Sequence, residues 1–550
     1  MISKIRQGGI KGKSRNYSEF LLDMDDDIVD APTIKDGTPP GSLAHSNNTM
    51  FILYPNGWKE KNNDQTNVSL HYESLLNALV NKSLINEFYN EDLTYVGPYT
   101  FSYFKKLKKV HLPNVTEISS RSFVHNESLE EIILESITEI PDCAFSDSIY
   151  NSIPEVYPIN ANYINKCRNA LKKIYAPNAT SIGENAFFNC TGLTDVNIPN
   201  ATNIGTYDFA GCKSLIDINL PNAISIGGYA FYNCISLESI YLPNATSIGN
   251  SAFWNCINLK NISLPNITSM DNYAFGLCSK LKNINLPNIT SIGTQTFYSC
   301  TSLESIDLPS VTSISNYAFY KCISLKDVNL SNATSIGDFA FYSCTSLESI
   351  DLPNATSIGS YAFCTCTNLA NISLPNATNN IKTYAFYNCT SLTDVSLPNV
   401  TNIGTYAFSN CTSLESIDLP NATSISPGAF MYCTSLESID LPNATSIGNN
   451  AFNHCNNLKC INASAVKSIG TSCFRNMASL ESIYLKSCTT IAKNSFNDNT
   501  NPKDIYLPNA QNKYTNAPWG AVNATIHYEC EFNEDGIPLE LIEDEEQEGE

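Results

Sequence analysis

The sequence predicts a repeat solenoid, a stack of about 18 coils of 22 residues each. Two observations carry this prediction. The word TSLESIDLPNATSIG at residues 345–359 returns almost unchanged from Thr301, Thr412 and Thr434, and phenylalanine recurs every 22 residues over most of the chain. A stack buries the apolar side of each unit against its neighbours, so a chain of 550 residues does not require several globular domains.

Each unit follows the pattern L-x-x-I-x-L-P-N-A-T-S-I-G-x-x-A-F-x-x-C-x-S. Its first part predicts a short strand in which Leu347, Ile350 and Leu352 face inward. Pro353 has no N–H to donate to a sheet, so it ends the strand. We expect such strands to pair in parallel from one coil to the next.

The second part of the unit predicts turns or short helical segments. Asn354 belongs to a turn, where we expect its side chain to bond its own backbone. Ile358 returns the chain to the core, and Gly359 permits the next bend. A small alanine, a bulky phenylalanine and the cysteine position then complete the coil.

The spacing of the phenylalanines shows where the repeat is interrupted. One step is 23 residues long because of an extra residue around Asn379–Asn380, and one step is 42 residues long. We interpret the longer step as a loop insertion near residues 146–165. The 18 phenylalanines are Phe101, Phe123, Phe145, Phe187, Phe209, Phe231, Phe253, Phe275, Phe297, Phe319, Phe341, Phe363, Phe386, Phe408, Phe430, Phe452, Phe474 and Phe496.

This motif strongly resembles the BspA-like, or treponemal-type, leucine-rich repeat family, from about Phe101 to Pro508. The resemblance implies a leucine-rich repeat solenoid of parallel strands. The segment Asn516–Tyr528 resembles the closing piece that often follows such arrays, and Trp519 would shield the last coil. We therefore expect a solenoid over residues 96–508, a C-terminal cap over 509–530 and an acidic tail over 531–550.

Residues 1–95 differ in composition and predict a small mixed region that anchors or caps the array. Gly41–Glu60 is typical of a β-hairpin or short meander, and it weakly resembles a piece that recurs in bacteriophage virion proteins. His71–Asn90 has helical periodicity.

Thirteen of the 20 cysteines share one position of the repeat, which indicates a column of buried thiols. Met477 follows in this position, and we place Phe104 and His125 there in the first coils. Disulfides between neighbouring coils are the alternative, but stacked side chains point the same way. The thirteen are Cys190, Cys212, Cys234, Cys256, Cys278, Cys300, Cys322, Cys344, Cys366, Cys389, Cys411, Cys433 and Cys455.

The sequence contains none of the motifs that we associate with catalysis or with metal or cofactor binding, so we expect no enzyme, no cofactor and no metal site. The net charge of −21 argues against nucleic acid as a partner. No stretch approaches the roughly 20 apolar residues of a membrane span, and the N-terminus lacks the pattern of a secretory signal. We expect the N-A-T words to serve in turns rather than as glycosylation sites.

The surface is then the candidate site. Positions between the inward residues of each strand vary from coil to coil, as expected for a face that meets a partner, although exposed positions also vary freely without function. On this face we single out Tyr241, Asp307, Asp351, Asp418, Asp440, Tyr484 and Tyr506. An aromatic series directly after the phenylalanines is a second candidate: Tyr232, Trp254, Tyr298, Tyr320, Tyr342 and Tyr387.

Two functions fit these features, and an intracellular scaffold is a third, less specific alternative. In the first, residues 1–95 attach to a virion protein of a bacteriophage, and the array engages a protein or glycan of the host surface. In the second, the chain is a BspA-like cell-surface adhesin of a bacterium or protist that binds host protein or matrix. The localisation is the virion in the first reading and the cell surface in the second, and either is compatible with a homo-oligomer.

Overall fold

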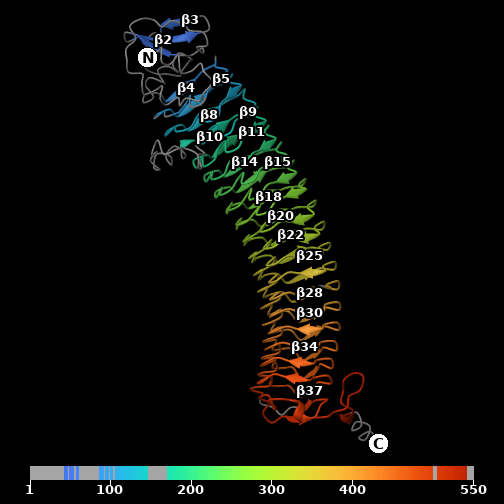
Figure 1. Ribbon diagram of the computed structural model, residues 1–550. Coiled ribbons are helices and arrows are strands. Elements are labelled where there is room, and N and C mark those ends of the chain that lie inside the picture. The colour runs from blue at the N-terminus through green and yellow to red at the C-terminus, as the bar shows by residue number, and fades with distance from the viewer. Residues whose placement is uncertain are drawn as a thin grey trace. The chain divides into compact units, whose positions relative to one another are not determined.

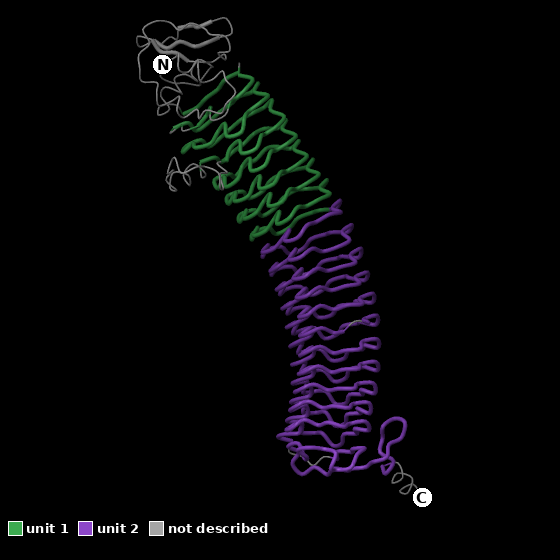
Figure 2. The backbone as a smooth tube through the Cα atoms, viewed as in Figure 1, with its two compact units in different colours: residues 1–264 green, residues 265–550 purple. Residues whose placement is uncertain are grey.

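The computed structural model describes residues 86–146, 170–499 and 504–541, apart from 92, 98, 99, 103, 105 and 379, and the backbone of three strands between residues 43 and 60. The chain divides into two compact units, Met1–Leu264 and Pro265–Glu550 (Figure 2). Each unit contains a stack of coils, and each coil contributes one three-residue strand and usually one two-residue strand (Figure 1). The fold is a parallel-strand solenoid with almost no helix among the described residues.

Unit 1 begins with an antiparallel three-stranded sheet, in which β2 pairs with both β1 and β3. This sheet lies in the segment for which a hairpin or short meander is expected. Residues 71–85 of the expected helix lie outside the described residues, but the end of that segment is a strand. β4 pairs in parallel with β6, with Phe88 opposite Val110, so the parallel sheet begins before residue 96.

The strands of unit 1 form two columns. The antiparallel sheet contains β1 (Leu43–Ser46), β2 (Thr49–Tyr54) and β3 (Gly57–Glu60). The three-residue strands are β4 (Glu87–Tyr89), β6 (Lys109–His111), β8 (Glu131–Ile133), β10 (Lys173–Tyr175), β12 (Asp195–Asn197), β14 (Asp217–Asn219), β16 (Ser239–Tyr241) and β18 (Asn261–Ser263). The two-residue strands are β5 (Tyr95–Val96), β7 (Glu117–Ile118), β9 (Glu139–Ile140), β11 (Ser181–Ile182), β13 (Asn203–Ile204), β15 (Ser225–Ile226) and β17 (Ser247–Ile248).

Unit 2 repeats the arrangement and closes it with a cap. Its three-residue strands are β20 (Asn283–Asn285), β22 (Ser305–Asp307), β24 (Asp327–Asn329), β26 (Ser349–Asp351), β28 (Asn371–Ser373), β29 (Asp394–Ser396), β31 (Ser416–Asp418), β33 (Ser438–Asp440), β35 (Cys460–Asn462), β37 (Ser482–Tyr484), β39 (Asp504–Tyr506) and β40 (Thr525–His527). Its two-residue strands are β19 (Ser269–Met270), β21 (Ser291–Ile292), β23 (Ser313–Ile314), β25 (Ser335–Ile336), β27 (Ser357–Ile358), β30 (Asn402–Ile403), β32 (Ser424–Ile425), β34 (Ser446–Ile447), β36 (Ser468–Ile469) and β38 (Thr490–Ile491), and a 3-10 helix, η2, spans Gln511–Lys513. The cap packs Trp519 against Phe496, with ring centroids 6.5 Å apart.

The core consists of identical side chains that lie on one another in successive coils. The recurrent phenylalanines form a stacked column in each unit. Ring centroids are 5.3 Å apart for Phe209 and Phe231 in unit 1, and 5.3 Å apart for Phe341 and Phe363 in unit 2. Each of these rings is 0% exposed, and full burial of such a side chain contributes about 1.5–3 kcal/mol.

Neither interruption of the repeat breaks the stack. β10 pairs directly with β8 across the 42-residue step, and the Phe145 and Phe187 rings stack at 4.9 Å. No coil therefore separates β8 from β10. At the 23-residue step the two-residue strand is reduced to a single bridge from Ile381 to Ile403, while the phenylalanine column continues.

The segment around each phenylalanine is made of turns rather than helix. The residues two before and two after it adopt positive φ, as do Tyr229 (58°) and Asn233 (60°) around Phe231. Gly359, which we expected to permit a bend, does not adopt a positive φ. A Cβ on Gly359 would lie 2.4 Å from the backbone carbon of Gly337, so glycine here allows neighbouring coils to approach closely.

The column of thiols is buried, as predicted, and the structure gives it a second function. The Cys234 thiol donates to the carbonyl oxygen of Phe209 in the preceding coil, with 3.0 Å from Sγ to O, and most other thiols of the column repeat this contact. The prediction for His125 was wrong by one residue. Asn126 occupies that position, and its amide donates to the carbonyl oxygen of Phe101. At the other end Asn499 donates to Phe474 in the same way, over 2.9 Å.

The turn asparagines also differ from the expectation. The Asn354 amide does not bond its own backbone. Its Nδ2 donates to the carbonyl oxygen of Ser331 in the preceding coil over 2.8 Å, and Asn376 does the same to Pro353 over 2.7 Å. These asparagines therefore join coils rather than closing single turns.

Candidate binding surfaces

The three-residue strands form one continuous exposed face in each unit, which we call the strand face. In most of these strands the central residue is buried and both flanking residues are exposed. The pleat dictates this alternation, because successive side chains point to opposite sides of a sheet. Variable residues thus lie on a rigid, regularly spaced surface.

Most of the residues predicted for this face lie on it. Tyr241 is 55% exposed, and Asp307, Asp351, Asp418 and Asp440 are exposed. Tyr484 is half-buried. Tyr506 differs from the expectation because it is only 5% exposed. It packs against His527, with ring centroids 4.3 Å apart, and burial raises the pKa of Tyr506 to about 12.

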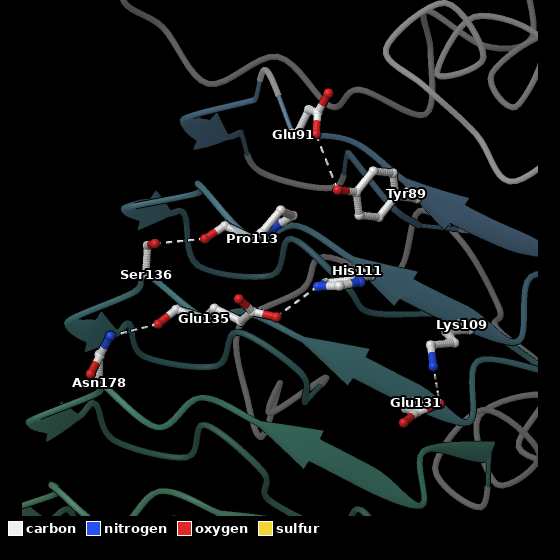
Figure 3. Close-up of polar contacts among 9 residues, drawn as sticks. All are labelled: Tyr89, Glu91, Lys109, His111, Pro113, Glu131, Glu135, Ser136 and Asn178. Carbon is white, nitrogen blue, oxygen red and sulfur yellow. Dashed lines mark hydrogen bonds and ion pairs between the residues drawn. The ribbon is translucent and has the colours of Figure 1, made fainter.

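At the start of unit 1 the strand face carries paired charges. Lys109 Nζ lies 2.9 Å from Glu131 Oε2 on the next coil, and Lys172 Nζ lies 2.9 Å from Glu130 Oε2. Figure 3 shows the Lys109 pair beside a second contact, in which His111 Nε2 lies 2.9 Å from Glu135 Oε1. The Lys172 hydrogen bond lowers the pKa of Glu130. Opposite charges on neighbouring coils therefore neutralise one another here.

In unit 2 the strand face carries carboxylates on four of five consecutive coils, those of β26, β29, β31 and β33, while the β28 coil has none. Lys and Arg are absent from the strand-face positions of these coils. Among the described residues, one ion pair involves a carboxylate of this stretch: Lys459 Nζ lies 3.7 Å from Glu437 Oε2. We call these exposed carboxylates the acidic stretch: Glu348, Asp351, Asp394, Glu415, Asp418, Glu437 and Asp440.

The predicted aromatic series is the half-exposed edge of a larger aromatic surface. Tyr298, Tyr320 and Tyr342 stack with centroids 4.9 Å apart, and burial raises the pKa of Tyr320 and Tyr342. Cys364 replaces the aromatic residue on the next coil, before Tyr387. In unit 1, Tyr232 is 37% exposed and Trp254 is half-buried.

A second aromatic column lies beside this series, and the sequence analysis missed it. It consists of aromatic residues that have a positive φ and lie two residues before a recurrent phenylalanine. The Phe339 ring stacks between Tyr317 and Tyr361, with centroid distances of 4.7 and 4.6 Å. The recurrent Y-A-F word contained the signal. The two columns contact each other, as in Tyr384 and Tyr387, whose centroids are 5.3 Å apart. Rings within one column stack face to face, whereas Tyr384 and Tyr387, from the two columns, meet edge to face.

The described residues contain no group of three or more His, Cys, Asp or Glu side chains placed to hold a metal ion. In the same part of the chain, none of the helices is long and apolar enough to span a membrane. The surfaces that remain are the strand face and the aromatic columns.

Comparison with known proteins agrees with this architecture. The profile of the BspA type leucine rich repeat region matches residues 75–152, 157–280, 246–355, 334–443 and 423–519. No curated protein matches the chain.

Three solved structures illustrate the likeness. A leucine-rich repeat protein from Bacteroides ovatus is 25% identical, with a TM-score of 0.50, over 71% of this chain and 92% of that one. A leucine rich cell surface protein from Faecalibacterium prausnitzii is 29% identical, with a TM-score of 0.34, over 52% and 82%. A leucine rich repeat protein from T. pallidum is 27% identical, with a TM-score of 0.21, over 38% and 82%. With its profile match, its repeat and its parallel strands, the chain belongs to the BspA type leucine-rich repeat family.

Proposed function

We propose that this protein is a cell-surface adhesin that binds a basic protein partner through the strand face of unit 2. Leucine-rich repeat arrays are typically binding proteins rather than enzymes, which supports the general class. The observation that carries the proposal is the acidic stretch, which places seven exposed carboxylates on four of five consecutive coils; among the described residues one ion pair, to Lys459, reaches them.

Electrostatics favours a cationic partner. Like charges on neighbouring strands repel, and directly opposed pairs cost about 0.2–1 kcal/mol each. The start of unit 1 avoids this cost with lysines, as in the pair of Lys109 and Glu131. The acidic stretch retains it where carboxylates occupy equivalent positions on the coils of β31 and β33, as Glu415 and Glu437 do and as Asp418 and Asp440 do. A partner rich in Lys and Arg would relieve the repulsion and associate faster through long-range attraction.

The bacteriophage reading rests on the segment Gly41–Glu60, and it stays a prediction. The family match, which extends from residue 75, favours the cell-surface reading instead. Mild proteolysis of intact cells would release fragments of a surface protein, whereas mass spectrometry of purified virus particles would detect a virion component. Protection on intact cells together with detection in particles would contradict our proposal.

The face itself is tested by neutralisation. We expect the variant with Asp307, Asp351, Asp418 and Asp440 changed to Asn to bind a fluorescent lysine-rich peptide at least about tenfold more weakly at about 0.1 M salt. Asn keeps the size of Asp and still accepts the hydrogen bond that Asn329 donates to Asp307, so the melting temperature should not change.

A control variant has the same net charge as the neutralised variant, but its substitutions lie on another face. Four exposed threonines that directly precede two-residue strands are replaced by Lys: Thr334, Thr356, Thr423 and Thr445. This variant should still bind the peptide more strongly than the neutralised one. Equal weakening by both variants would mean that net charge, and not the strand face, attracts the peptide.

A further inference from the structure

The chain continues beyond the cap into a segment that folds onto the end of the strand face. We call residues Cys530–Leu541 the cover segment. It forms a tight turn of its own, in which the N–H of Asn533 donates to the Ile537 carbonyl oxygen over 2.9 Å, and a bridge joins Phe532 to Pro538. Gly536 at the turn has a φ of 85°.

Two side chains, Asn462 on the strand face and Lys486 just after β37, hold this turn by its main chain. Lys486 Nζ donates to the carbonyl oxygen of Asn533 over 2.7 Å. Asn462 Nδ2 donates to the carbonyl oxygen of Asp535 over 3.4 Å. Gly536 lies so close to Ser464 that a Cβ on the glycine would be 2.6 Å from the serine Cβ.

The end of the cover segment meets the cap. Glu540 Oε1 lies 3.5 Å from His527 Nδ1, while His527 Nε2 lies 3.1 Å from Asp504 Oδ1. The His527 ring also stacks on Tyr506. In unit 1, Tyr241 occupies the equivalent strand-face position and is 55% exposed. Tyr506 is therefore buried at a position that is open elsewhere on the face.

The cover segment is weakly integrated into the fold. After Cys530, whose N–H donates to Leu507, no backbone hydrogen bond joins residues 531–541 to the coils within the described part of the chain. Most of its side chains are exposed or half-buried. Segments held by few backbone bonds and little burial open at low free-energy cost.

We propose that the cover segment is a detachable peptide bound in cis, and that the face beneath it is a site for acidic, turn-forming peptides. Lys486 and Asn462 would recognise main-chain carbonyl oxygens of a turn, and His527 would meet a carboxylate near its end. The rings of Tyr484 and Tyr506, whose centroids are 5.4 Å apart, belong to the same last coils. This proposal deepens the proposed function and rests on it, because both use the strand face for binding. It differs in the ligand of the last coils, which is an acidic peptide rather than a basic protein.

The full-length chain with Gly536→Val tests detachment. The added side chain would collide with Ser464 and disfavour the positive φ, so the segment should leave the face while the face itself is unchanged. We expect hydrogen exchange at residues 531–541 to accelerate at least about tenfold, with exchange at the Phe452 coil unchanged. Glu534→Ala changes an exposed residue of the same turn and should leave exchange as in the wild type.

The site is tested with a fluorescent peptide of residues 529–541 added in trans. It should bind the Gly536→Val chain at least about tenfold more tightly than the wild type, because the wild-type face is occupied. Adding Lys486→Met should remove that binding, and a peptide that itself carries Gly536→Val should not bind.

Two outcomes would overturn the proposal. Unchanged exchange in the Gly536→Val chain would show that the segment is a fixed part of the fold. Accelerated exchange without peptide binding would show that the uncovered face is not a peptide site. Because neither measurement uses a basic partner, both are independent of the test of the acidic stretch.

Discussion

The thiol of Cys344 donates a hydrogen bond to the carbonyl oxygen of Phe319, which lies in the preceding coil, with 3.1 Å from Sγ to O. The same oxygen accepts the N–H of Cys322 from its own coil, also over 3.1 Å. Each cysteine of the column therefore fills the core and links two coils. Near the two ends of the array Asn126 and Asn499 replace the thiol, and their amides make the same link.

The contribution of this link can be measured by truncation. We expect Cys344→Ala to lower the free energy of unfolding by about 1–3 kcal/mol, because it removes buried volume and the cross-coil hydrogen bond. Cys364→Ala is the control, since Cys364 is also buried but lies outside the column. Urea unfolding followed by circular dichroism compares the two. A Cys344→Ala chain no less stable than the control would contradict the role of the bond.

The thiol column should make the fold sensitive to alkali. Burial raises the pKa of Cys234 and Cys411 from 9.0 to about 12. The folded state therefore binds these protons more tightly, so the associated stability is complete below pH 9.0 and is lost as the pH rises toward 12. Each thiol contributes up to about 1.4 kcal/mol per pH unit in this window.

The measurement is the melting temperature as a function of pH. We expect a decline that starts near the unfolded thiol pKa of 9.0, and a shallower decline in a Cys234→Ala, Cys411→Ala chain. Tyrosines titrate in the same range, and the double variant separates their effect. Identical slopes for the two chains would rule out the thiols as the cause.

The same burial should protect the thiols from alkylation. In the native protein at about pH 8, iodoacetamide is expected to modify Cys143, Cys460 and Cys530, which are half-buried, before any cysteine of the column. Peptide mass spectrometry identifies the modified sites. Unfolding in urea should make all cysteines reactive, and early labelling of the column in the native chain would mean that the coils open readily.

Asp208 should destabilise unit 1 at neutral pH. It occupies the position that Ala230 holds in the next coil, and it is 0% exposed. Burial raises the pKa of Asp208 well above 3.8, and the carboxylates of Asp142 and Glu184 add to the rise, although its Oδ2 accepts the N–H of Gly205 over 2.5 Å. The fold thus favours the protonated form, and this stability is lost as the pH rises from 3.8 through the folded pKa.

Replacement of Asp208 by Ala should therefore raise the free energy of unfolding by about 1–3 kcal/mol at neutral pH, with the gain shrinking toward pH 3.8. Asp217→Ala removes an exposed carboxylate of the next coil as a control. Urea titrations at both pH values decide the matter. A destabilised Asp208→Ala chain at neutral pH would show that the carboxylate has a structural role that outweighs its burial.

The sequence predicted what repetition dictates. The phenylalanine column, the buried thiols and the undisturbed phase past Asn379 all follow from identical residues stacked in register. The exposed aspartates could be located for the same reason, because the pleat places the residue after Ile306 or Ile350 outward.

The remaining features depend on contacts that one repeat unit does not contain. An asparagine in this turn can bond either its own backbone or the preceding coil, and the sequence pattern does not choose between the two; in the structure Asn354 bonds Ser331 of the preceding coil. The burial of Tyr506 depends on a segment that follows the repeats and shares none of their pattern. The positive φ of Tyr317 costs the backbone about 1–2 kcal/mol, and the ring stacks on Phe339 of the next coil, a contact that lies outside one repeat unit.

The direct pairing of β8 with β10 also has a practical meaning for protein engineering. Since the two coils close on each other across residues 146–169, the stack does not fix the length of the chain that connects them. A reporter domain or an affinity tag could be fused within this stretch while the ring contact between Phe145 and Phe187 is kept. The junction offers an internal attachment point that leaves both ends of the protein untouched.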